Sequence, residues 1–357
     1  MSQPDSESLA KPPRANPDLV GQEEAERTLL AACASGRMPH AWLIAGQGGI
    51  GKATLAFRFA RYIFAESGRR PNSLQIDGSH PVFHRVAAGG HADLLTVERQ
   101  FDEERGRQRK EIAVDDVRRI APFLHLTAAE GGWRIVILDG ADGMNRAGQN
   151  AVLKILEEPP HGALLLLLTE RPSALLPTIR SRCRLLTLPP LSDTTVERLI
   201  VQYRPDIDAN AGARLATAAA GSIGRALEIA RNDGLVLLGQ FLAIAGGREV
   251  DWAAGHALGD KLAPAAADES YRAFAQLLVD LLSRAARELG RGVQGKRTEL
   301  VPGEHELVAR LGQGGQLERA LEVWEKVSHL FTRSDSANLD RRLTVISALD
   351  AVSAALR

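Results

Sequence analysis

A glycine-rich stretch near the N-terminus, AGQGGIGKATLAFRFARYIF at 45–64, has the spacing G-x-x-x-x-G-K of a phosphate-binding loop. Its loop residues are Gly46, Gly48, Gly49, Gly51 and Lys52. Glycines let backbone N–H groups turn toward phosphate oxygens, and the N-terminus of the following helix adds partial positive charge. We therefore predict a phosphate site at which Lys52 supplies the point charge. The alternative is a glycine-rich turn that holds no ligand.

The position after this lysine lacks the hydroxyl group that a phosphate-binding loop uses. A Ser or Thr there is a direct Mg²⁺ ligand, whereas this chain has Ala53. Thr54 does not replace it, because adjacent residues of a helix point about 100° apart. Nucleotide binding can survive without this ligand, but we expect metal-assisted hydrolysis to be severely reduced.

A second acidic motif shows a similar loss. The stretch RIVILDGADGM predicts a strand that ends at Asp139, where a carboxylate can orient the metal ion through water. An ATPase of this type has a second carboxylate in the next position to polarise the attacking water, but this chain has Gly140, followed by Asp142. A strand followed by a plain Gly/Asp turn would contain the same residues. The two losses together predict a loop without hydrolytic activity of its own.

The composition narrows the class of protein. The 357 residues include 44 basic and 44 acidic side chains, so the net charge is zero. This balance argues against a general nucleic-acid coat and against a membrane-surface protein. Two cysteines, Cys33 and Cys183, are too few for a disulfide scaffold. The start shows no signal peptide, and no apolar run approaches the ~20 residues of a membrane helix. We expect a soluble cytoplasmic protein of two or three domains.

Short apolar strands alternate with amphipathic helices up to about residue 190, which predicts a parallel α/β domain. The predicted strands are 41–45, 93–98, 134–138, 163–168 and 184–188. Apolar runs such as RIVIL and ALLLLL are typical of strands covered on both faces. The charged stretch RQFDEERGRQRKE at 99–111 is expected to form an exposed loop or helix end. From residue 192 onward the pattern predicts helices alone.

Several motifs follow one another in an order known from one family. They are LVGQ at 19–22, PHAWLIAGQGGIGKATLA at 39–56, NAVLKILEEPP at 150–160, LLPTIRSRC at 175–183 and GSIGRAL at 221–227. This series resembles the bacterial clamp-loader branch of the AAA+ family. The stretch ANLDRRLTVISALDAV at 337–352 is similar to the last helix of that family's collar domain. The resemblance covers nearly the whole chain after its polar, Pro-rich lead.

The resemblance implies an architecture of α/β and all-α parts. We expect a disordered lead at 1–17 and a RecA-like AAA+ domain with a parallel sheet at 18–190. A small helical lid at 191–238 and an all-α collar at 239–357, through which subunits assemble, would follow.

The resemblance also implies roles for particular residues. In Ser181-Arg182-Cys183, Arg182 is expected to be an arginine finger that acts in trans on a neighbouring subunit's nucleotide, where a guanidinium stabilises charge on the γ-phosphate. Thr169 falls at the sensor-1 position and Arg225 at the sensor-2 position. The degenerate nucleotide site would then comprise Gly46, Gly48, Gly49, Gly51, Lys52, Ala53, Thr54, Asp139, Thr169 and Arg225. For Arg182, the alternative is a surface arginine paired with a carboxylate. For Thr169 it is a strand-terminal threonine, and for Arg225 a helix-start arginine on a solvated face.

Metal and cofactor expectations follow from what the chain lacks. Many relatives have a four-cysteine zinc module between the phosphate helix and the second strand, but residues 66–93 contain no cysteine. His80, His84 and His91 without thiolates are a weak zinc signal, so we expect no zinc and no other metal. No cofactor is required, and ATP or ADP bound without hydrolysis remains open.

These observations predict a non-hydrolysing subunit that is not catalytic alone. It would stand in a hetero-oligomeric ring with clamp-loader ATPase subunits and a clamp-opening subunit. Through that complex it would meet the sliding clamp and primer-template DNA. One alternative is an active ATP-hydrolysing motor subunit of the same loader. The others are an unrelated P-loop kinase or helicase domain, and a scaffold whose loop and arginine are relics.

Overall fold

The computed structural model describes residues 10–65, 72–102, 107–109, 111–130, 132–291, 298–313, 317–337 and 339–357. The chain divides into two compact units. The first runs to Thr195 and includes Gln202–Arg204, and the second comprises Val196–Val201 and Pro205–Arg357. Most of the segments predicted as lid and collar therefore lie within one unit.

The first unit is built on a parallel five-stranded sheet. Its strands are β1 Ala41–Ala45, β2 Leu94–Val97, β5 Arg134–Leu138, β6 Ala163–Thr169 and β7 Arg184–Thr187. They lie in the order β2-β5-β6-β1-β7, with every neighbouring pair parallel. All five predicted strands are confirmed, with ends that differ by a residue or so. The parallel sheet with the phosphate loop after its first strand is the predicted RecA-like AAA+ domain.

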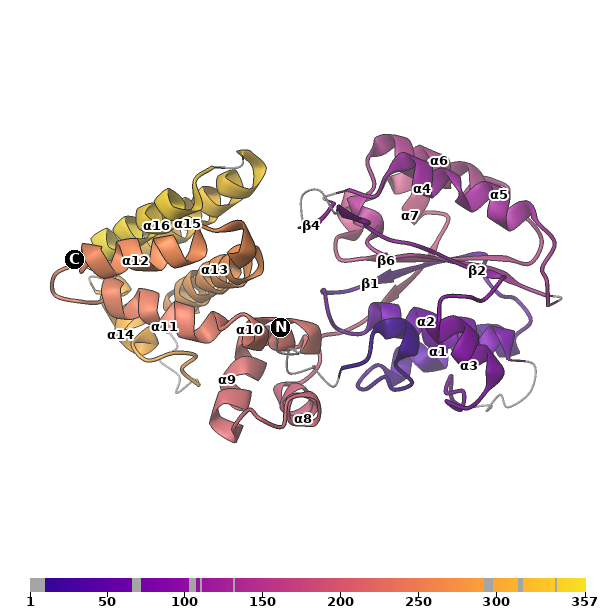
Figure 1. Ribbon diagram of the computed structural model, residues 1–357, viewed down its shortest axis with the longest axis horizontal. Helices are drawn as coiled ribbons and strands as arrows, with labels where there is room; N and C mark the ends of the chain where they lie inside the picture. The colour runs from indigo at the N-terminus through magenta and orange to yellow at the C-terminus, as the bar shows by residue number, and fades with distance from the viewer. Residues whose placement is uncertain are drawn as a thin grey trace, which may run out of the picture. The chain divides into compact units, whose positions relative to one another are not determined.

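Helices cover both faces of this sheet (Figure 1). On one face lie α1 Glu23–Ala34, α2 Lys52–Phe64 and α3 Pro81–Ala87. On the other face lie α4 Val114–Arg118, α5 Ile120–His125, α6 Arg146–Glu157 and α7 Pro177–Arg180. Alternate strand residues divide between the two cores: Leu164 and Leu166 pack with the first set of helices, and Leu165 and Leu167 with the second. This double covering explains why the strands are apolar at nearly every position.

The charged stretch at 99–111 differs from its prediction. Instead of a loop or helix end, its backbone forms two short antiparallel strands, β3 Phe101–Asp102 and β4 Arg107–Gln108. The pairing continues with a hydrogen bond from the Arg109 N–H to the Gln100 carbonyl at 2.9 Å. A strand of two residues is too short to give a periodic pattern in the sequence.

A disordered lead was predicted at 1–17, but part of that segment is ordered. Residues 1–9 lie outside the described residues, but Pro13–Ala15 form a short 3₁₀ helix, η1. Arg61 of α2 holds this segment: its guanidinium donates to the Arg14 carbonyl at 2.9 Å and the Asn16 carbonyl at 2.7 Å. The same guanidinium lies over the Phe83 ring at 4.6 Å. Burial lowers the pKa of Arg61 to about 10. The polar, Pro-rich sequence of this segment does not predict that an arginine of α2 holds it in place.

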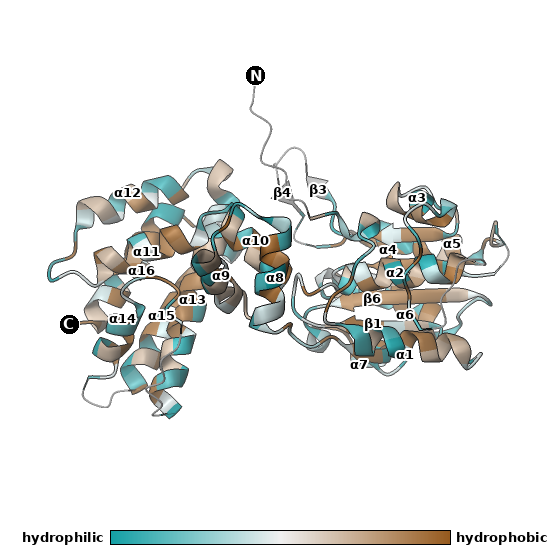
Figure 2. Cartoon of the chain, turned by 90° about the horizontal axis from the view of Figure 1, so that it is seen from below, coloured by the Kyte–Doolittle hydropathy of each residue, from teal (hydrophilic) through white to brown (hydrophobic). Residues whose placement is uncertain are grey.

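The second unit is helical throughout its described residues. Its helices include α9 Ala209–Ala219, α10 Ile223–Arg231, α11 Gly234–Ala245, α12 Trp252–Leu262, α13 Asp268–Arg291, α14 Glu304–Leu311, α15 Leu317–Ala337 and α16 Arg341–Ala355, and α8 Asp193–Tyr203 spans the boundary with the first unit. Aromatic contacts join three of them: the Phe274 ring lies 5.5 Å from Phe241 and 6.2 Å from Phe331. The Tyr271 and Ser334 hydroxyl groups, 2.9 Å apart, add a buried hydrogen bond. In Figure 2 β6 is brown along its length, whereas these helices alternate brown and teal, as amphipathic helices do.

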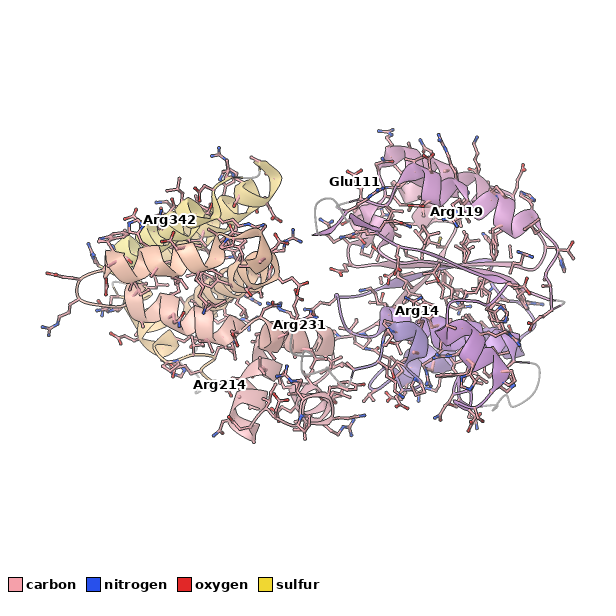
Figure 3. All side chains as sticks on the ribbon, viewed as in Figure 1. Arg14, Glu111, Arg119, Arg214, Arg231 and Arg342 are labelled. Atoms are coloured by element: carbon pink, nitrogen blue, oxygen red, sulfur yellow. The ribbon has the colours of Figure 1, made fainter. Side chains whose placement is uncertain are left out.

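Charged side chains of both signs are mixed on the surfaces of both units (Figure 3). Several exposed arginines have a carboxylate neighbour, at 3.7 Å for Arg119–Asp116 and at 2.9 Å for Arg342–Asp260. The neutral net charge is therefore also locally balanced at these places. Within the described residues, no helix is both long and apolar enough to cross a membrane.

The Arg61 anchor predicts a stability effect. Replacing Arg61 by Met removes two charge-assisted hydrogen bonds, so we expect the free energy of unfolding to fall by about 2–4 kcal/mol. Urea denaturation measures this, and hydrogen exchange should show faster exchange of residues 10–20. Arg27→Ala is the control: this exposed arginine pairs only with Glu24, so a change within about 0.5 kcal/mol is expected. Equal effects of the two substitutions would contradict the anchor.

Candidate nucleotide site and arginine finger

The carboxyl ends of three parallel strands bring the candidate site together. The loop after β1 begins at Gly46, whose N–H donates to the Thr169 carbonyl at the end of β6 at 3.1 Å. Asp139 follows β5, and its N–H donates to the Val97 carbonyl of β2 at 2.8 Å. Loop, acidic motif and sensor-1 position therefore share one edge of the sheet, where ligands bind in open parallel sheets.

The loop has the backbone form of a phosphate cradle. Gly51 caps α2 with φ 104°, a left-handed conformation that favours glycine. A methyl group on Gly51 would come within 2.7 Å of Leu19 Cδ1, so the LVGQ segment packs directly on the loop. Lys52 is 8% exposed, and its ammonium donates to the Gly46 and Gln47 carbonyls, each at 2.8 Å. Two of its three donors are thus taken by the loop, and one remains for an anion.

Lys52 is electrostatically tied to the acidic groups of this edge. Burial lowers its pKa, while the carboxylates of Glu170, Asp139 and Asp142 act in the opposite direction. Burial also raises the pKa of Asp139, against the influence of Lys52. The loop and the lysine fit a nucleotide's phosphates in geometry.

The residues that would handle a metal ion and water do not fit. The methyl group of Ala53 packs against the apolar core beneath α2, and the buried Thr54 is no substitute ligand. At Gly140 a methyl group would lie 3.6 Å from Arg99 Nη2. An arginine therefore lies where a hydrolytic site has a second carboxylate. Sequence reasoning missed Arg99, because no pattern links it to a glycine 41 residues away.

The hydroxyl group of Thr169 already has a hydrogen-bond partner within the chain. Thr169 is fully buried and donates to Asp142 Oδ1 at 3.1 Å. Asp142 also accepts from the Glu170 N–H at 3.2 Å and from Arg171 Nε at 3.3 Å. Burial alone would raise the pKa of Asp142, but these hydrogen bonds lower it below its ordinary value. Asp142 therefore organises the end of β6, a role that the sequence did not suggest.

Another residue missed in the sequence is Glu170, directly after β6. A methyl group on Gly48 would come within 2.6 Å of Glu170 Oε1, so the carboxylate of Glu170 lies against the phosphate loop. The only signal available was its position one residue after Thr169.

The candidate finger is on the surface of the first unit. The Arg182 side chain is 37% exposed, with Nη2 at 3.1 Å from Glu157 Oε1 of α6. Its Nη1 donates to the Thr178 carbonyl of α7 at 3.2 Å. These bonds use part of the donor fork and leave other N–H groups for a phosphate. The alternative of a surface arginine paired with a carboxylate describes this isolated chain equally well.

Helix α6 also holds the segment that leads to the finger. The Gln149 side chain is buried; its Nε2 donates to the Met144 and Ala174 carbonyls at 3.2 and 3.3 Å. Its Oε1 accepts from the Leu176 N–H at 2.8 Å. Gln149 and Glu157 therefore fix α7 and Arg182 to one rigid helix.

Arg225 has an ion-pair partner inside the second unit. It follows the N-cap Ser222 of α10, and its Nη2 pairs with Asp280 of α13. Asp280 also accepts from Gln276 at 3.1 Å.

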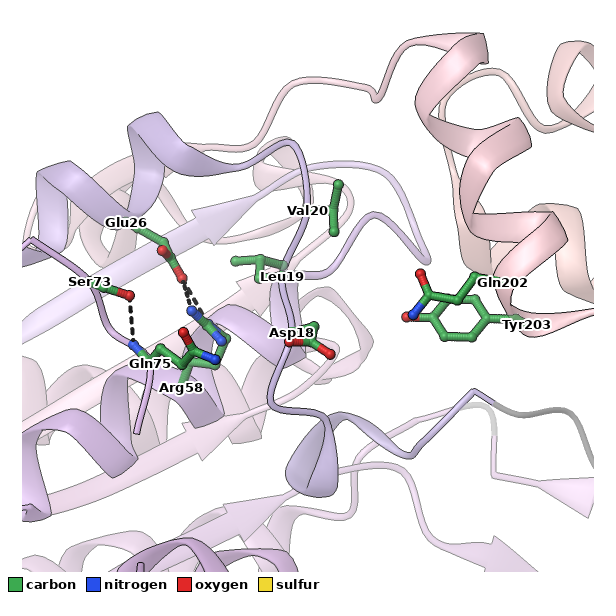
Figure 4. A pocket seen from close by; sticks show the side chains of 9 residues that line it. All are labelled: Asp18, Leu19, Val20, Glu26, Arg58, Ser73, Gln75, Gln202 and Tyr203. Carbon is green, nitrogen blue, oxygen red and sulfur yellow. Dashed lines mark hydrogen bonds and ion pairs between the residues drawn. The ribbon is translucent and has the colours of Figure 1, made fainter. Parts of the chain in front are cut away.

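A pocket of about 330 Å³ lies beside the LVGQ segment, within the residues of the first unit (Figure 4). Its lining residues are Asp18, Leu19, Val20, Glu26, Arg58, Ser73, Gln75, Gln202 and Tyr203. The buried Arg58 pairs with Glu26 at 2.7 Å, so its charge is neutralised within the pocket wall.

The three histidines considered for zinc have separate environments. His80 caps α3, accepting from the Val82 N–H at 3.2 Å, and His91 is stacked on Phe64 with ring centroids 4.0 Å apart. His84 packs edge-on against a neighbouring phenylalanine. In the part of the chain that the structure describes, no three His, Cys, Asp or Glu residues come close enough to hold a metal ion.

Comparison with known proteins finds related sequences. Residues 21–192 match the family described as DNA polymerase III, delta subunit. The DNA polymerase III subunit delta' of Pseudomonas aeruginosa is 40% identical over 144 residues, 40% of this chain and 41% of that protein. The subunit delta' of Escherichia coli is 34% identical over 207 residues, 57% of this chain and 58% of that protein. The subunit gamma/tau of Mycobacterium bovis is 32% identical over 165 residues, 46% of this chain and 27% of that protein.

These matches confirm the resemblance to the clamp-loader branch of the AAA+ family and, within it, to delta-prime subunits. The chain spans about half the length of the delta-prime relatives it matches, and about a quarter of the gamma/tau relative.

The third residue of the Ser-Arg-Cys motif yields a prediction about thiol chemistry. Cys183 packs against the core beneath α6 and α7, and burial raises its pKa to about 12 from an ordinary value of 9.0. At pH 8 the thiolate fraction is then about 1000-fold lower than for an ordinary cysteine, so a Cys33→Ser variant should react about 1000-fold more slowly with a disulfide reagent than the same variant in urea.

The same shift sets the sign of a pH effect. Between pH 9 and 12 the unfolded thiol loses its proton and the folded thiol keeps it, so the Cys183 contribution to the free energy of unfolding decreases as the pH rises. Cys183→Ser should remove this contribution. Equal reactivity of the folded and unfolded thiol would contradict the predicted burial.

Proposed function

We propose that this chain, whose residues 21–192 match the DNA polymerase III delta subunit family, works as the delta-prime subunit of a clamp loader. In this role it holds the motor fold without hydrolysing ATP and completes a neighbouring subunit's site with Arg182. It needs no cofactor of its own. The observation that carries the proposal is the pairing of a degraded loop with an exposed arginine fixed to α6.

The non-hydrolysing part rests on two places in one site. Ala53 offers a methyl group to the core where a metal ligand is needed, and Gly140 lies beside Arg99 where a carboxylate is needed. Without both, a bound nucleotide lacks an ordered metal ion and an activated water.

The finger part rests on the position of Arg182. A guanidinium that reaches a γ-phosphate stabilises the charge that spreads in the transition state, worth about 10³–10⁵ in rate. Such a contribution needs an arginine that is exposed yet held in place, and Glu157 with the Thr178 carbonyl holds Arg182 at the surface.

The proposed partners are gamma/tau ATPase subunits and a delta subunit in a hetero-oligomeric ring, through which the chain meets the sliding clamp and primer-template DNA. The ring would work in the cytoplasm. Similarity to a gamma/tau subunit supports a common assembly, because related domains pack in related ways. Exposed apolar side chains on the second unit, Trp252, Leu321 and Leu343 among them, are of the kind that an interface covers.

The alternative of an active motor subunit is favoured by one observation. A stretch of 165 residues of this chain is 32% identical to a gamma/tau subunit. That function needs a hydroxyl at position 53 and a carboxylate at position 140, and the chain has neither.

The test is DNA-stimulated ATP turnover in a loader reconstituted with its ATPase and clamp-opening subunits. With Arg182→Ala, the site that this arginine completes should slow by about 10³-fold or more. Total turnover should fall by the share that this site contributes. The isolated chain should hydrolyse no ATP.

Arg180→Ala is the matched control, because this exposed arginine lies two residues away in the same motif. It should leave turnover unchanged. If the isolated chain hydrolyses ATP and Arg182→Ala changes nothing in the complex, the chain is a motor subunit instead.

A further inference from the structure

The carboxylate of Glu170 lies against the phosphate loop at Gly48. A methyl group on Gly48 would come within 2.6 Å of Oε1 and 3.2 Å of the carboxyl carbon of Glu170. The carboxylate of Glu170 therefore lies against the loop backbone at Gly48, which has no side chain. A glycine at this position lets an anion approach the loop backbone closely. In this chain, the anion that lies there is the carboxylate of Glu170.

The same carboxylate also acts electrostatically on the ammonium group of Lys52. Burial lowers the pKa of Lys52, and the carboxylates of Glu170, Asp139 and Asp142 act in the opposite direction, Glu170 more than the other two. Lys52 has one donor left after its bonds to the two loop carbonyls, so it can interact with one further anion. Glu170 and a nucleotide phosphate would both be attracted to this ammonium group.

The backbone keeps Glu170 in this place. Its N–H donates to Asp142 Oδ1 at 3.2 Å, and Asp142 also binds Thr169 before it and Arg171 after it. The residue is thus fixed at the end of β6, next to the start of the loop. Its side chain is exposed, so its own solvation does not depend on this contact.

We infer that Glu170 is an internal counter-anion of the phosphate loop that opposes the binding of nucleoside di- and triphosphates to this chain. The loop keeps the glycines and the lysine of an anion site, and Glu170 neutralises that site. A bound polyphosphate must displace the carboxylate or accept its repulsion. The inference goes beyond the proposed function, because it concerns the chain's own loop and is independent of Arg182.

The experiment measures binding of a fluorescently labelled ADP to the isolated full chain by anisotropy. Glu170→Gln keeps the size of the side chain and removes its charge, and we expect binding to tighten about tenfold, which corresponds to about 1.4 kcal/mol. Glu170→Asp keeps the charge but shortens the reach to Gly48, so a smaller gain is expected. Circular dichroism checks that both variants fold.

Glu98→Gln is the matched control. Glu98 is exposed and acts on Asp139 from the same edge of the sheet, but the three atoms nearest to a methyl group on Gly48 all belong to Glu170. It should change the affinity less than twofold. Adding Lys52→Ala to Glu170→Gln should abolish the gain, because the new binding is at the loop. The inference is overturned if Glu170→Gln binds like the wild type, or if Glu98→Gln tightens binding equally. Either result leaves the Arg182 test unaffected, so the two proposals can fail separately.

Discussion

Lys52 can be buried as a charge only if oxygen atoms surround it, and this requirement organises the carboxyl edge of the sheet. Two loop carbonyls accept directly from its ammonium, and carboxylates in the segments that follow β5 and β6 also balance its charge. Those carboxylates must in turn be held apart, because like charges at short range raise one another's pKa. Asp142 meets this need by accepting hydrogen bonds from the end of β6, whereas Asp139 stays close to the lysine.

The losses at positions 53 and 140 are compatible with this balance. The methyl group of Ala53 contributes to the core beneath α2 instead of ligating a cation. Gly140 leaves room for the Arg99 guanidinium. Packing and internal charge pairs therefore hold this edge of the sheet together.

Sequence reasoning predicted the parts of this molecule that depend on local pattern. The strands at 41–45 and 134–138 were found to the residue, since double burial imposes apolar residues at nearly every position. The 3₁₀ turn at 13–15 and the hairpin after Gln100 were missed, because their order comes from a distant arginine and from backbone pairing. In the site, the loop residues were predictable from spacing. The residues that contact Gly48, Gly140 and Arg182, namely Glu170, Arg99 and Glu157, were not, because contacts between residues far apart in sequence leave no periodic signal.

Helix α6 joins the two halves of the proposed role. Its twelve residues span about 18 Å. Near its start Gln149 binds the carbonyl of Met144, which closes the loop after Asp139, and at its end Glu157 pairs with Arg182. Both contacts belong to one helix, so the loop after Asp139 and Arg182 share one support. In the proposed role, the position of Arg182 therefore depends on the packing of α6 as well as on its own ion pair with Glu157.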